Sequence, residues 1–201
     1  MKAMILREFN KPLRKDDVPL PTIGNEDLLI KVKGCGVCYT DVKIASGLFP
    51  EISLPRILGH EVAGEVVGLG RDVKNFKDGD RVCLYFYLFC GQCANCLDKK
   101  ENLCLNLRGR IGFNFDGGYA EYVKAPATHA FKIPPHLSFE EAAILTDAVA
   151  TPLHGLRQAE IKAGETLAVI GAGGLGLQAV QIGKFLEARV LSVDLEEKRL
   201  E

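Results

Sequence analysis

Four cysteines lie close together near the middle of the sequence, and their spacing is typical of a metal site. Cys90, Cys93 and Cys96 follow one another at intervals of three, and Cys104 comes after seven intervening residues. Four thiolates around one ion suit zinc, which accepts tetrahedral sulfur ligation at about 2.3 Å. An iron–sulfur cluster and a set of free thiols are the alternatives. We predict zinc, and a structural one, because an all-cysteine shell leaves no position for a substrate.

A second, dispersed set of residues could hold a catalytic metal. It consists of Cys38 in GCGVCYTD, His60 in GHE and Asp147 in LTDAVATPLHG. One sulfur, one imidazole nitrogen and one carboxylate leave a fourth position for water or an alcohol, as a catalytic zinc requires. Each residue also has an ordinary interpretation, as a small buried thiol, a hydrogen-bonded interior histidine or a surface charge. Spacing alone does not join them.

A glycine-rich segment in the last third of the chain is typical of a dinucleotide-binding loop. The sequence GAGGLG places glycines at Gly171, Gly173, Gly174 and Gly176. The segment follows the apolar run LAVI and precedes a helical pattern, which distinguishes such a loop from a simple glycine turn. Asp194, about 20 residues on, could accept hydrogen bonds from ribose hydroxyls and would repel a 2′-phosphate. The pattern favours NAD over NADP, although Lys198 and Arg199 lie near enough to leave NADP open.

The elements that position these residues fall into two parts. From Met1 to about Phe131, short apolar runs alternate with turn signals, which indicates a strand-rich domain. The runs that best fit strands are Leu28–Val32, Glu61–Leu69, Arg81–Leu84 and Tyr119–Val123. Ser138 and Glu141 have the spacing of a capping box, which predicts a helix over Glu140–Leu145. Pro152 should interrupt or restart this helix.

The remainder of the chain has the pattern of a βαβ unit. We predict a strand over Thr166–Ile170, a helix over Gly173–Leu186 and a second strand over Arg189–Asp194. The expected fold class is therefore mixed, with a β-rich domain over 1–150 followed by the first βαβ part of an α/β, doubly wound domain over 151–201.

Composition excludes several classes of partner. The chain has 201 residues, of which 47% are hydrophobic and 25% charged, and its formal net charge is -1. Such a balance gives no field that would attract nucleic acid or a membrane surface, so a small molecule fits better. The N-terminus does not resemble a signal peptide and no run of about 18 apolar residues is present, so we expect a cytoplasmic protein. Seven cysteines in that compartment favour metal ligation over disulfides.

Several motifs in order resemble the zinc-containing alcohol dehydrogenases of the medium-chain dehydrogenase/reductase family. They are GCGVCYTD, the segment GHEVAGEVVGLGRDV over Gly59–Val73, GDRV over Gly79–Val82, the four cysteines and GAGGLG. The resemblance covers essentially the whole chain. It implies a GroES-like catalytic domain over 1–150 and an incomplete NAD-binding Rossmann domain over 151–201.

The resemblance also implies roles for individual residues. Cys38, His60 and Asp147 would bind the catalytic zinc, although some relatives have cysteine where Asp147 stands. Glu61 would be a nearby or transient ligand. Asp41 would accept the other ring proton of His60, which fixes the ring orientation.

Three further positions follow from the same resemblance. Thr40 would take the proton from a bound alcohol, and Thr151 would contact the nicotinamide. Relatives often pass the proton on through a histidine at the position of Lys43. Lys43 could substitute if its pKa were lowered, but we favour a solvated surface charge. Tyr39 stands where relatives often carry histidine or arginine, so no cofactor-phosphate contact is assigned to it.

The function implied is reversible, NAD-linked oxidation of an alcohol to an aldehyde or ketone, with two zinc ions per full subunit and a small-molecule substrate. A polyol or sugar dehydrogenase of the same family is one alternative, and a zinc-stabilised domain without catalysis is another. We expect the chain to be the N-terminal part of a longer polypeptide that alone lacks most of the nicotinamide pocket. The resemblance further implies a homo-oligomer, dimer or tetramer, at full length.

Overall fold

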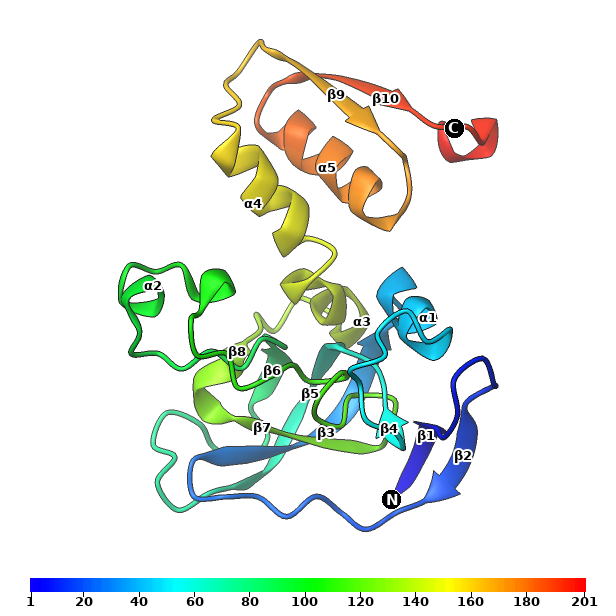
Figure 1. Ribbon diagram of the computed structural model, residues 1–201. Helices are drawn as coiled ribbons and strands as arrows, with labels where there is room; N and C mark the ends of the chain where they lie inside the picture. Colours follow the sequence, from blue (N-terminus) through cyan, green and yellow to red (C-terminus); the bar gives the residue numbers. More distant parts are fainter. The chain divides into compact units, whose positions relative to one another are not determined.

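The computed structural model describes all residues from Met1 to Glu201, and the chain divides into two compact units, Met1–Ile144 and Leu145–Glu201. The first unit is built on antiparallel sheets, and the second on one pair of parallel strands with helices (Figure 1). None of the helices is both long enough and apolar enough to cross a bilayer. The β-rich domain followed by a βαβ unit, predicted from the sequence, is confirmed.

A five-stranded antiparallel sheet is the centre of the first unit. Its spatial order is β7 (Tyr122–Pro126), β3 (Asp27–Gly36), β5 (Glu61–Leu69), β6 (Arg81–Leu84) and β8 (Ala130–Lys132). Leu28 and Ile30 alternate along β3 onto the buried face, as period-2 apolar patterning requires. Two register shifts in the β3–β5 pairing, at Leu29/Ile30 and at Val32/Gly34, mark bulges that bend β3. These two strands position the segments that carry Cys38 and His60.

A smaller sheet lies beside the N-terminus. It has the order β2 (Arg14–Asp17), β1 (Lys2–Leu6) and β4 (Arg56–Ile57), all antiparallel. The strand predicted over Tyr119–Val123 is wrong in its first half, because β7 begins only at Tyr122. The backbone N–H of Tyr119 instead donates to the carbonyl of Leu58, at 3.0 Å. This contact holds the turn before β7 against the segment that leads to His60.

Helices in the first unit are short. They are α1 (Tyr39–Ala45), α2 (Ala94–Leu97) and α3 (Phe139–Ala143), with 3-10 turns at Glu101–Leu103 and Ala127–His129. A further 3-10 turn, Ile144–Thr146, begins at the last residue of this unit. The capping box at Ser138 is confirmed: Ser138 N donates to Glu141 Oε2 at 2.8 Å, and Glu141 N donates to Ser138 Oγ at 3.1 Å. The helix covers a different span from the predicted Glu140–Leu145, because the last turn tightens into a 3-10 helix.

The core of the first unit fills the space between the two sheets and α1. Its fully buried large side chains include Leu6, Leu28, Ile30, Ile44, Leu58, Val62, Val66, Val82, Leu84 and Ile111. Burying a side chain of this size contributes roughly 1.5–3 kcal/mol each to stability. Helix α3 packs on β3, β5 and β6, and Gly34 in β3 permits the approach, because a Cβ there would lie 2.9 Å from the carbonyl oxygen of Phe139.

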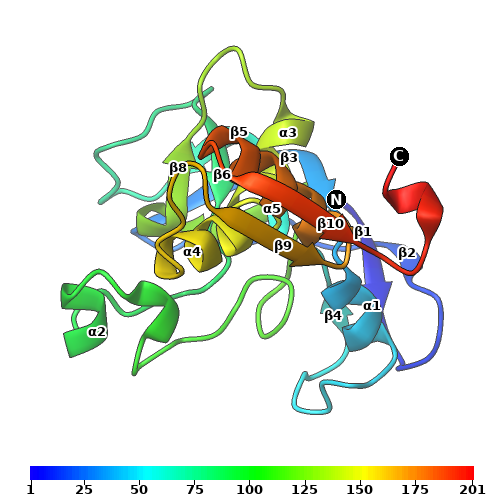
Figure 2. The same ribbon diagram turned by 90° about the horizontal axis from the view of Figure 1, so that it is seen from above.

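The second unit contains the predicted βαβ pattern. Its elements are α4 (Ala150–Gln158), β9 (Thr166–Ile170), α5 (Gly174–Phe185), β10 (Arg189–Val193) and a 3-10 turn at Glu197–Arg199. Strands β9 and β10 pair in parallel, in register from Thr166 with Arg189 to Ile170 with Val193 (Figure 2). Pro152 lies in the first turn of α4, where its missing N–H costs nothing, so it restarts a helix rather than kinking one. Ile170 and Phe185 are each 86% exposed.

Candidate metal and cofactor sites

The loop around α2 brings the four predicted cysteine ligands together. Their sulfur atoms all lie within 4.8 Å of one another. The Sγ of Cys93 is 3.4 Å from that of Cys96 and 4.0 Å from that of Cys104, and the Sγ of Cys90 is 4.0 Å from that of Cys96. We call residues 90–104 the cysteine lobe; Figure 1 shows it in green around α2. Gly91 adopts φ 73°, which lets the chain turn between the first two ligands.

The sulfur positions in the cysteine lobe fit a tetrahedral ion. Four sulfurs at about 2.3 Å from a common centre lie roughly 3.8 Å apart, close to the observed separations. Backbone N–H groups also point at the sulfurs, from Cys90 to Cys104 at 3.2 Å and from Cys93 to Cys90 at 3.3 Å. Such donors stabilise thiolate charge. The donor set therefore fits a closed, structural zinc.

The thiols of the lobe differ in how readily they ionise. Hydrogen bonds from the backbone of Cys96 and of Leu105 lower the pKa of Cys93 to about 6. Burial, together with the neighbouring sulfur of Cys93, raises the pKa of Cys96 to about 12. Crowded sulfur atoms of this kind can carry charge together only when a cation lies among them.

Cys38 begins helix α1 at the end of β3. It is the N-cap residue, with extended backbone, and its sulfur accepts from the backbone N–H of Thr40 at 3.5 Å. Its own N–H donates to Asp41 Oδ2 at 3.1 Å, which completes a capping box. This short helix was not predicted from the sequence. The cap fixes the direction of the half-buried thiol.

His60 is almost fully buried beside Asp41. Its Nδ1 lies 3.3 Å from Asp41 Oδ1, and the exposed fractions of the two residues are 1% and 4%. A carboxylate only accepts hydrogen bonds, so Nδ1 carries the proton and Nε2 keeps the lone pair that a metal requires. The ring packs against Phe86 and Phe113, at centroid distances of 4.8 and 5.3 Å. These aromatic neighbours exclude water from one side of the imidazole.

The Asp41 carboxylate accepts hydrogen bonds from several donors besides His60. Oδ1 accepts from the backbone N–H of Gly59 at 3.2 Å, and Oδ2 accepts from Cys38 N and from the hydroxyl of Tyr119 at 2.9 Å. Burial, followed by the charge of Asp41, raises the pKa of Tyr119, so the phenol stays a neutral donor. Sequence reasoning assigned Asp41 to His60 but missed Tyr119, which the chain places 78 positions after Asp41.

Glu61 follows His60 at the start of β5 and is 3% exposed. Its carboxylate occupies the space beside Gly36: a Cβ on that glycine would lie 1.9 Å from Glu61 Oε2. Burial, with the charges of Asp41 and Glu61, raises the pKa of the nearby Cys35 thiol to about 12. Cys35 is therefore a protonated packing residue.

The other residues predicted for the catalytic metal site include Asp147 and Thr40. The donor atoms of Cys38 and His60 lie within 4.8 Å of each other, and Asp147 lies at the start of the second unit. Asp147 Oδ1 accepts from the Thr151 hydroxyl at 3.3 Å. Thr40 is half-buried in the first turn of α1.

Lys43 and Tyr39 lie together on the outer side of α1. Lys43 is exposed, and its Nζ lies 5.4 Å from the centroid of the exposed Tyr39 ring. A lysine over an aromatic face at the surface is a common cation–π arrangement. This placement agrees with the surface charge favoured from the sequence.

The glycine-rich loop connects β9 to the start of α5. Gly171 adopts φ 97° directly after β9, and Gly173 caps the twelve-residue helix α5, whose first residue is Gly174. A Cβ on Gly176 would lie 1.8 Å from the carbonyl oxygen of Gly171, so only glycine fits there. The exposed N–H groups at the start of α5 form a natural anion site.

Asp194 follows β10 and ties the loop to that strand. Its Oδ2 accepts from Ala172 N at 2.7 Å and its Oδ1 from Glu196 N at 2.9 Å. These backbone hydrogen bonds, first that of Glu196, lower the pKa of Asp194. Each oxygen has a second lone pair, so the carboxylate can still accept from a ribose hydroxyl.

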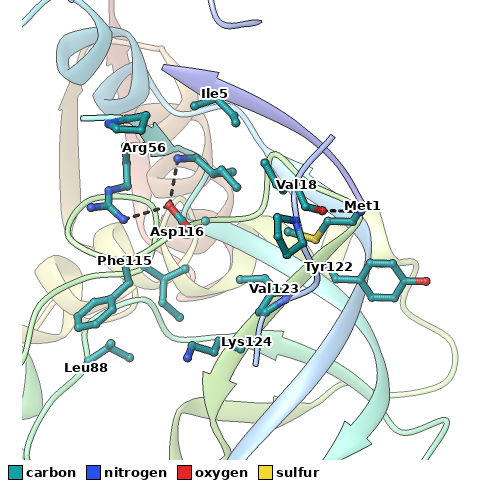
Figure 3. Close-up of a pocket in the computed structure, with 16 residues that line it drawn as sticks. Met1, Ile5, Val18, Arg56, Leu88, Phe115, Asp116, Tyr122, Val123 and Lys124 are labelled. Carbon is teal, nitrogen blue, oxygen red and sulfur yellow. Dashed lines mark hydrogen bonds and ion pairs between the residues drawn. The ribbon is translucent and has the colours of Figure 1, made fainter. Parts of the chain in front are cut away.

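A separate pocket of about 470 Å³ lies between β1, β4 and the start of β7. Figure 3 shows Ile5, Val18, Phe115 and Val123 among its apolar walls. Its charged pair neutralises itself, because Arg56 Nη1 donates to Asp116 Oδ1 at 3.0 Å. None of the predicted metal ligands lines this pocket, and most of its lining side chains are apolar.

The comparisons with known proteins agree with this geometry. The model of the family described as "Alcohol dehydrogenase GroES-like domain" matches residues 24–135, more than half of the chain. The chain belongs to this alcohol dehydrogenase family. The zinc-containing, medium-chain resemblance inferred from the motifs is thereby confirmed.

Individual relatives of the family are similar along the whole chain. An alcohol dehydrogenase of Geobacillus stearothermophilus is 42% identical over 100% of this chain and 60% of its own length. The acetophenone reductase of Geotrichum candidum, solved in complex with NAD, is 35% identical with a TM-score of 0.91, over 98% of this chain and 59% of that one.

A third relative was solved with metal. The alcohol dehydrogenase of Pyrobaculum aerophilum, bound to cobalt and zinc, is 32% identical with a TM-score of 0.92, over 98% of this chain and 60% of that one. The chain thus spans about 60% of the length of the relatives it matches.

Proposed function

We propose that the protein carrying this chain is a zinc- and nicotinamide-dependent oxidoreductase that interconverts an alcohol and an aldehyde or ketone. The observation that supports this best is the buried His60–Asp41 pair, which directs one imidazole nitrogen away from the carboxylate, close to the Cys38 thiol. The donor set of sulfur, nitrogen and the Asp147 carboxylate suits zinc with one position open to substrate.

The second zinc of the proposal belongs to the cysteine lobe and has a structural role. Its four sulfur donors leave no position for a substrate. The cobalt- and zinc-bound relative supports the choice of metal over an iron–sulfur cluster. Two zinc ions per full subunit, one in each site, is the stoichiometry proposed.

The proposed chemistry divides between the bound groups and the chain. When bound, zinc supplies Lewis acidity toward the substrate oxygen, and the nicotinamide takes or gives a hydride. His60 and Cys38 are held in fixed directions by Asp41 and by the α1 cap, which lowers the reorganisation needed on metal binding. Phe86 and Phe113 keep water from the imidazole.

Two residues of the site are proposed to act on the substrate proton and on the metal shell. Thr40 lies two residues after Cys38, half-buried in the same helical turn. We assign its hydroxyl to accept the proton from the alcohol. Glu61, buried at the start of β5, is assigned as a nearby or transient ligand.

The cofactor proposed is NAD. The GAGGLG loop, with the helix start at Gly174, would hold the pyrophosphate through backbone N–H groups. Asp194 would accept from a ribose hydroxyl and repel a 2′-phosphate, which favours NAD over NADP. Similar structures were solved with NAD and with NADP, so the choice of NAD rests on Asp194. Thr151 is assigned to the nicotinamide end.

The remaining parts of the proposal concern the whole protein. We assign residues 1–150 to a GroES-like catalytic domain and 151–201 to part of a Rossmann domain. A small alcohol, aldehyde or ketone is the substrate class, and a homo-oligomer, dimer or tetramer, is the assembly proposed. The cytoplasmic location stays a prediction.

The proposed site of Cys38, His60 and Asp147 is called the open site below. Its assignment is tested by His60→Ala, with His136→Ala, at an exposed histidine, as the matched control. In this chain, His60→Ala should bind one zinc fewer than the parent, measured by plasma mass spectrometry on dialysed protein. In the whole protein, NAD-dependent alcohol oxidation should fall by more than the roughly 10- to 100-fold loss typical of residues that only support a ligand. His136→Ala should match the parent in both assays.

Equal zinc content in His60→Ala and the parent would refute the open site. A full zinc complement with no turnover of primary, secondary or polyhydric alcohols in the whole protein would instead refute the proposed activity. The same screen separates simple alcohols from polyols and sugars as substrates.

A further inference from the structure

We propose that Tyr119 is a positioning residue of the open metal site, acting on His60 through Asp41. The inference rests on the proposed function, because it assumes that His60 is a metal ligand. Its starting point is the hydroxyl of Tyr119, which donates to Asp41 Oδ2 at 2.9 Å and lies 3.4 Å from the carbonyl oxygen of Gly36.

The two oxygens of Asp41 have different tasks. Oδ1 faces Nδ1 of His60 at 3.3 Å, whereas Oδ2 accepts from Tyr119 and from the backbone N–H of Cys38. A carboxylate on a single bond can rotate, and rotation would move Oδ1 out of the plane of the imidazole. Two donors on Oδ2 oppose that rotation from the far side. Together with Gly59 N on Oδ1, Tyr119 therefore holds the carboxylate whose Oδ1 orients the ring.

The ring and backbone of Tyr119 are themselves held in place. Its N–H donates to the Leu58 carbonyl at 3.0 Å, and its carbonyl accepts from Met4 N at 2.7 Å. The ring lies close to Gly59: a Cβ on that glycine would lie 2.6 Å from Tyr119 Cδ1. Gly59, with φ 90°, thus lets the phenol approach the residue directly before His60.

One residue consequently touches both supports of His60. Tyr119 contacts the backbone that precedes the histidine and the carboxylate that orients its ring. Partners of this kind typically change metal affinity by about 10- to 100-fold when removed. Since Cys38 N remains on Oδ2, we expect the lower end of that range for loss of the hydroxyl.

The test compares Tyr119→Phe with Tyr122→Phe, which removes a hydroxyl three residues away at the start of β7. Each 201-residue chain is first loaded with one equivalent of zinc, which the cysteine lobe should take, and then titrated with Co²⁺ against a competing chelator. Tyr119→Phe should bind this cobalt about 10-fold more weakly than the parent, and Tyr122→Phe should equal the parent. Equal affinities in all three chains, or equal losses in both variants, overturn the inference.

A second measurement needs no metal at the open site. In the chain that carries zinc only in the cysteine lobe, the Nδ1 proton of His60 should give a sharp, downfield NMR signal, and Tyr119→Phe should broaden this signal or move it upfield. A signal that is unchanged in Tyr119→Phe also overturns the inference. If the parent itself takes up no cobalt, the open site fails and with it the proposed function; if the parent binds cobalt and Tyr119→Phe binds it equally, only the inference fails.

Discussion

The cysteine lobe and the Cys38–His60 pair differ in how far along the chain their parts lie. The lobe takes all four sulfurs from residues 90–104, and most of the hydrogen bonds to those sulfurs come from within the same span. His60 is instead oriented by Asp41, which is held in turn by Gly59 and by the distant Tyr119. The lobe is a local structure that a metal can organise, whereas the pair depends on sheets that are already folded.

The sharpest test of this difference replaces one cysteine by serine in each of the two regions. Cys96→Ser should remove the zinc of the lobe and lower the free energy of unfolding by about 4 kcal/mol or more, as loss of a structural metal does. Cys38→Ser should remove the other metal at a cost below about 1 kcal/mol, because serine is a good N-cap for α1. Urea unfolding and zinc analysis of both variants check this.

The outcome that contradicts the comparison is an equal loss of stability in the two variants. It would mean that the metal at Cys38 also holds the fold together. A loss of zinc from Cys38→Ser with an unchanged urea midpoint would support the division into a structural and an open site.

The same difference explains what the sequence could predict. The four cysteines were identified from spacing alone, and β5, β6 and β9 have the predicted bounds, because these signals are local. The strand expected over Tyr119–Val123 begins late because Tyr119 bonds to Leu58, a contact between segments far apart in the sequence.

Side-chain partners in the open site could not be found from periodicity for a similar reason. Joining Cys38 with His60 required the family resemblance. The role inferred for Tyr119 has no signal in the sequence, since an aromatic residue after two glycines is compatible with any turn. Asp194 was predicted as a ribose ligand, but its bonds to the backbone of Ala172 and Glu196 appear only in three dimensions.

Even the local lobe has one long-range support, and acid should weaken it. His129 is 1% exposed and packs on Phe89, next to the first cysteine of the lobe, at a centroid distance of 4.3 Å. Burial, followed by the charge of Arg108, lowers the pKa of His129 from 6.5 to about 4. Between these values the unfolded chain binds more protons than the folded one, so stability is full above pH 6.5 and falls as the pH drops toward 4.

The expected loss over this window is up to about 3 kcal/mol, at 1.36 kcal/mol for each pKa unit. His129→Gln cannot take up the proton and should lose that much less between pH 6.5 and pH 4 in urea unfolding. The exposed His136→Gln serves as the control and should follow the parent. Parallel curves for His129→Gln and the parent would show that protonation of His129 does not cause the loss of stability in acid.

The smallest effect should come from α3, the helix that packs on the strands next to the open site. Ser138 caps α3, which packs on β3 and β5, the strands that lead to Cys38 and from His60. Ser138→Ala removes one cap hydrogen bond and should lower the free energy of unfolding by about 1 kcal/mol. The exposed Ser46, whose hydroxyl donates to Lys43 O at the end of α1, offers a serine control with a smaller expected cost.

Zinc affinity separates the two regions in this experiment. Because the ligands of the lobe lie outside α3 and the strands β3, β5 and β6 on which it packs, Ser138→Ala should leave the zinc affinity of the lobe equal to that of the parent. The second metal should bind slightly more weakly, since part of its binding energy would then restore the order of α3 and the two strands. If the affinities of both metals fell equally, the cysteine lobe would also depend on the packing of α3 on β3 and β5. The distinction between a local and an assembled site would then fail.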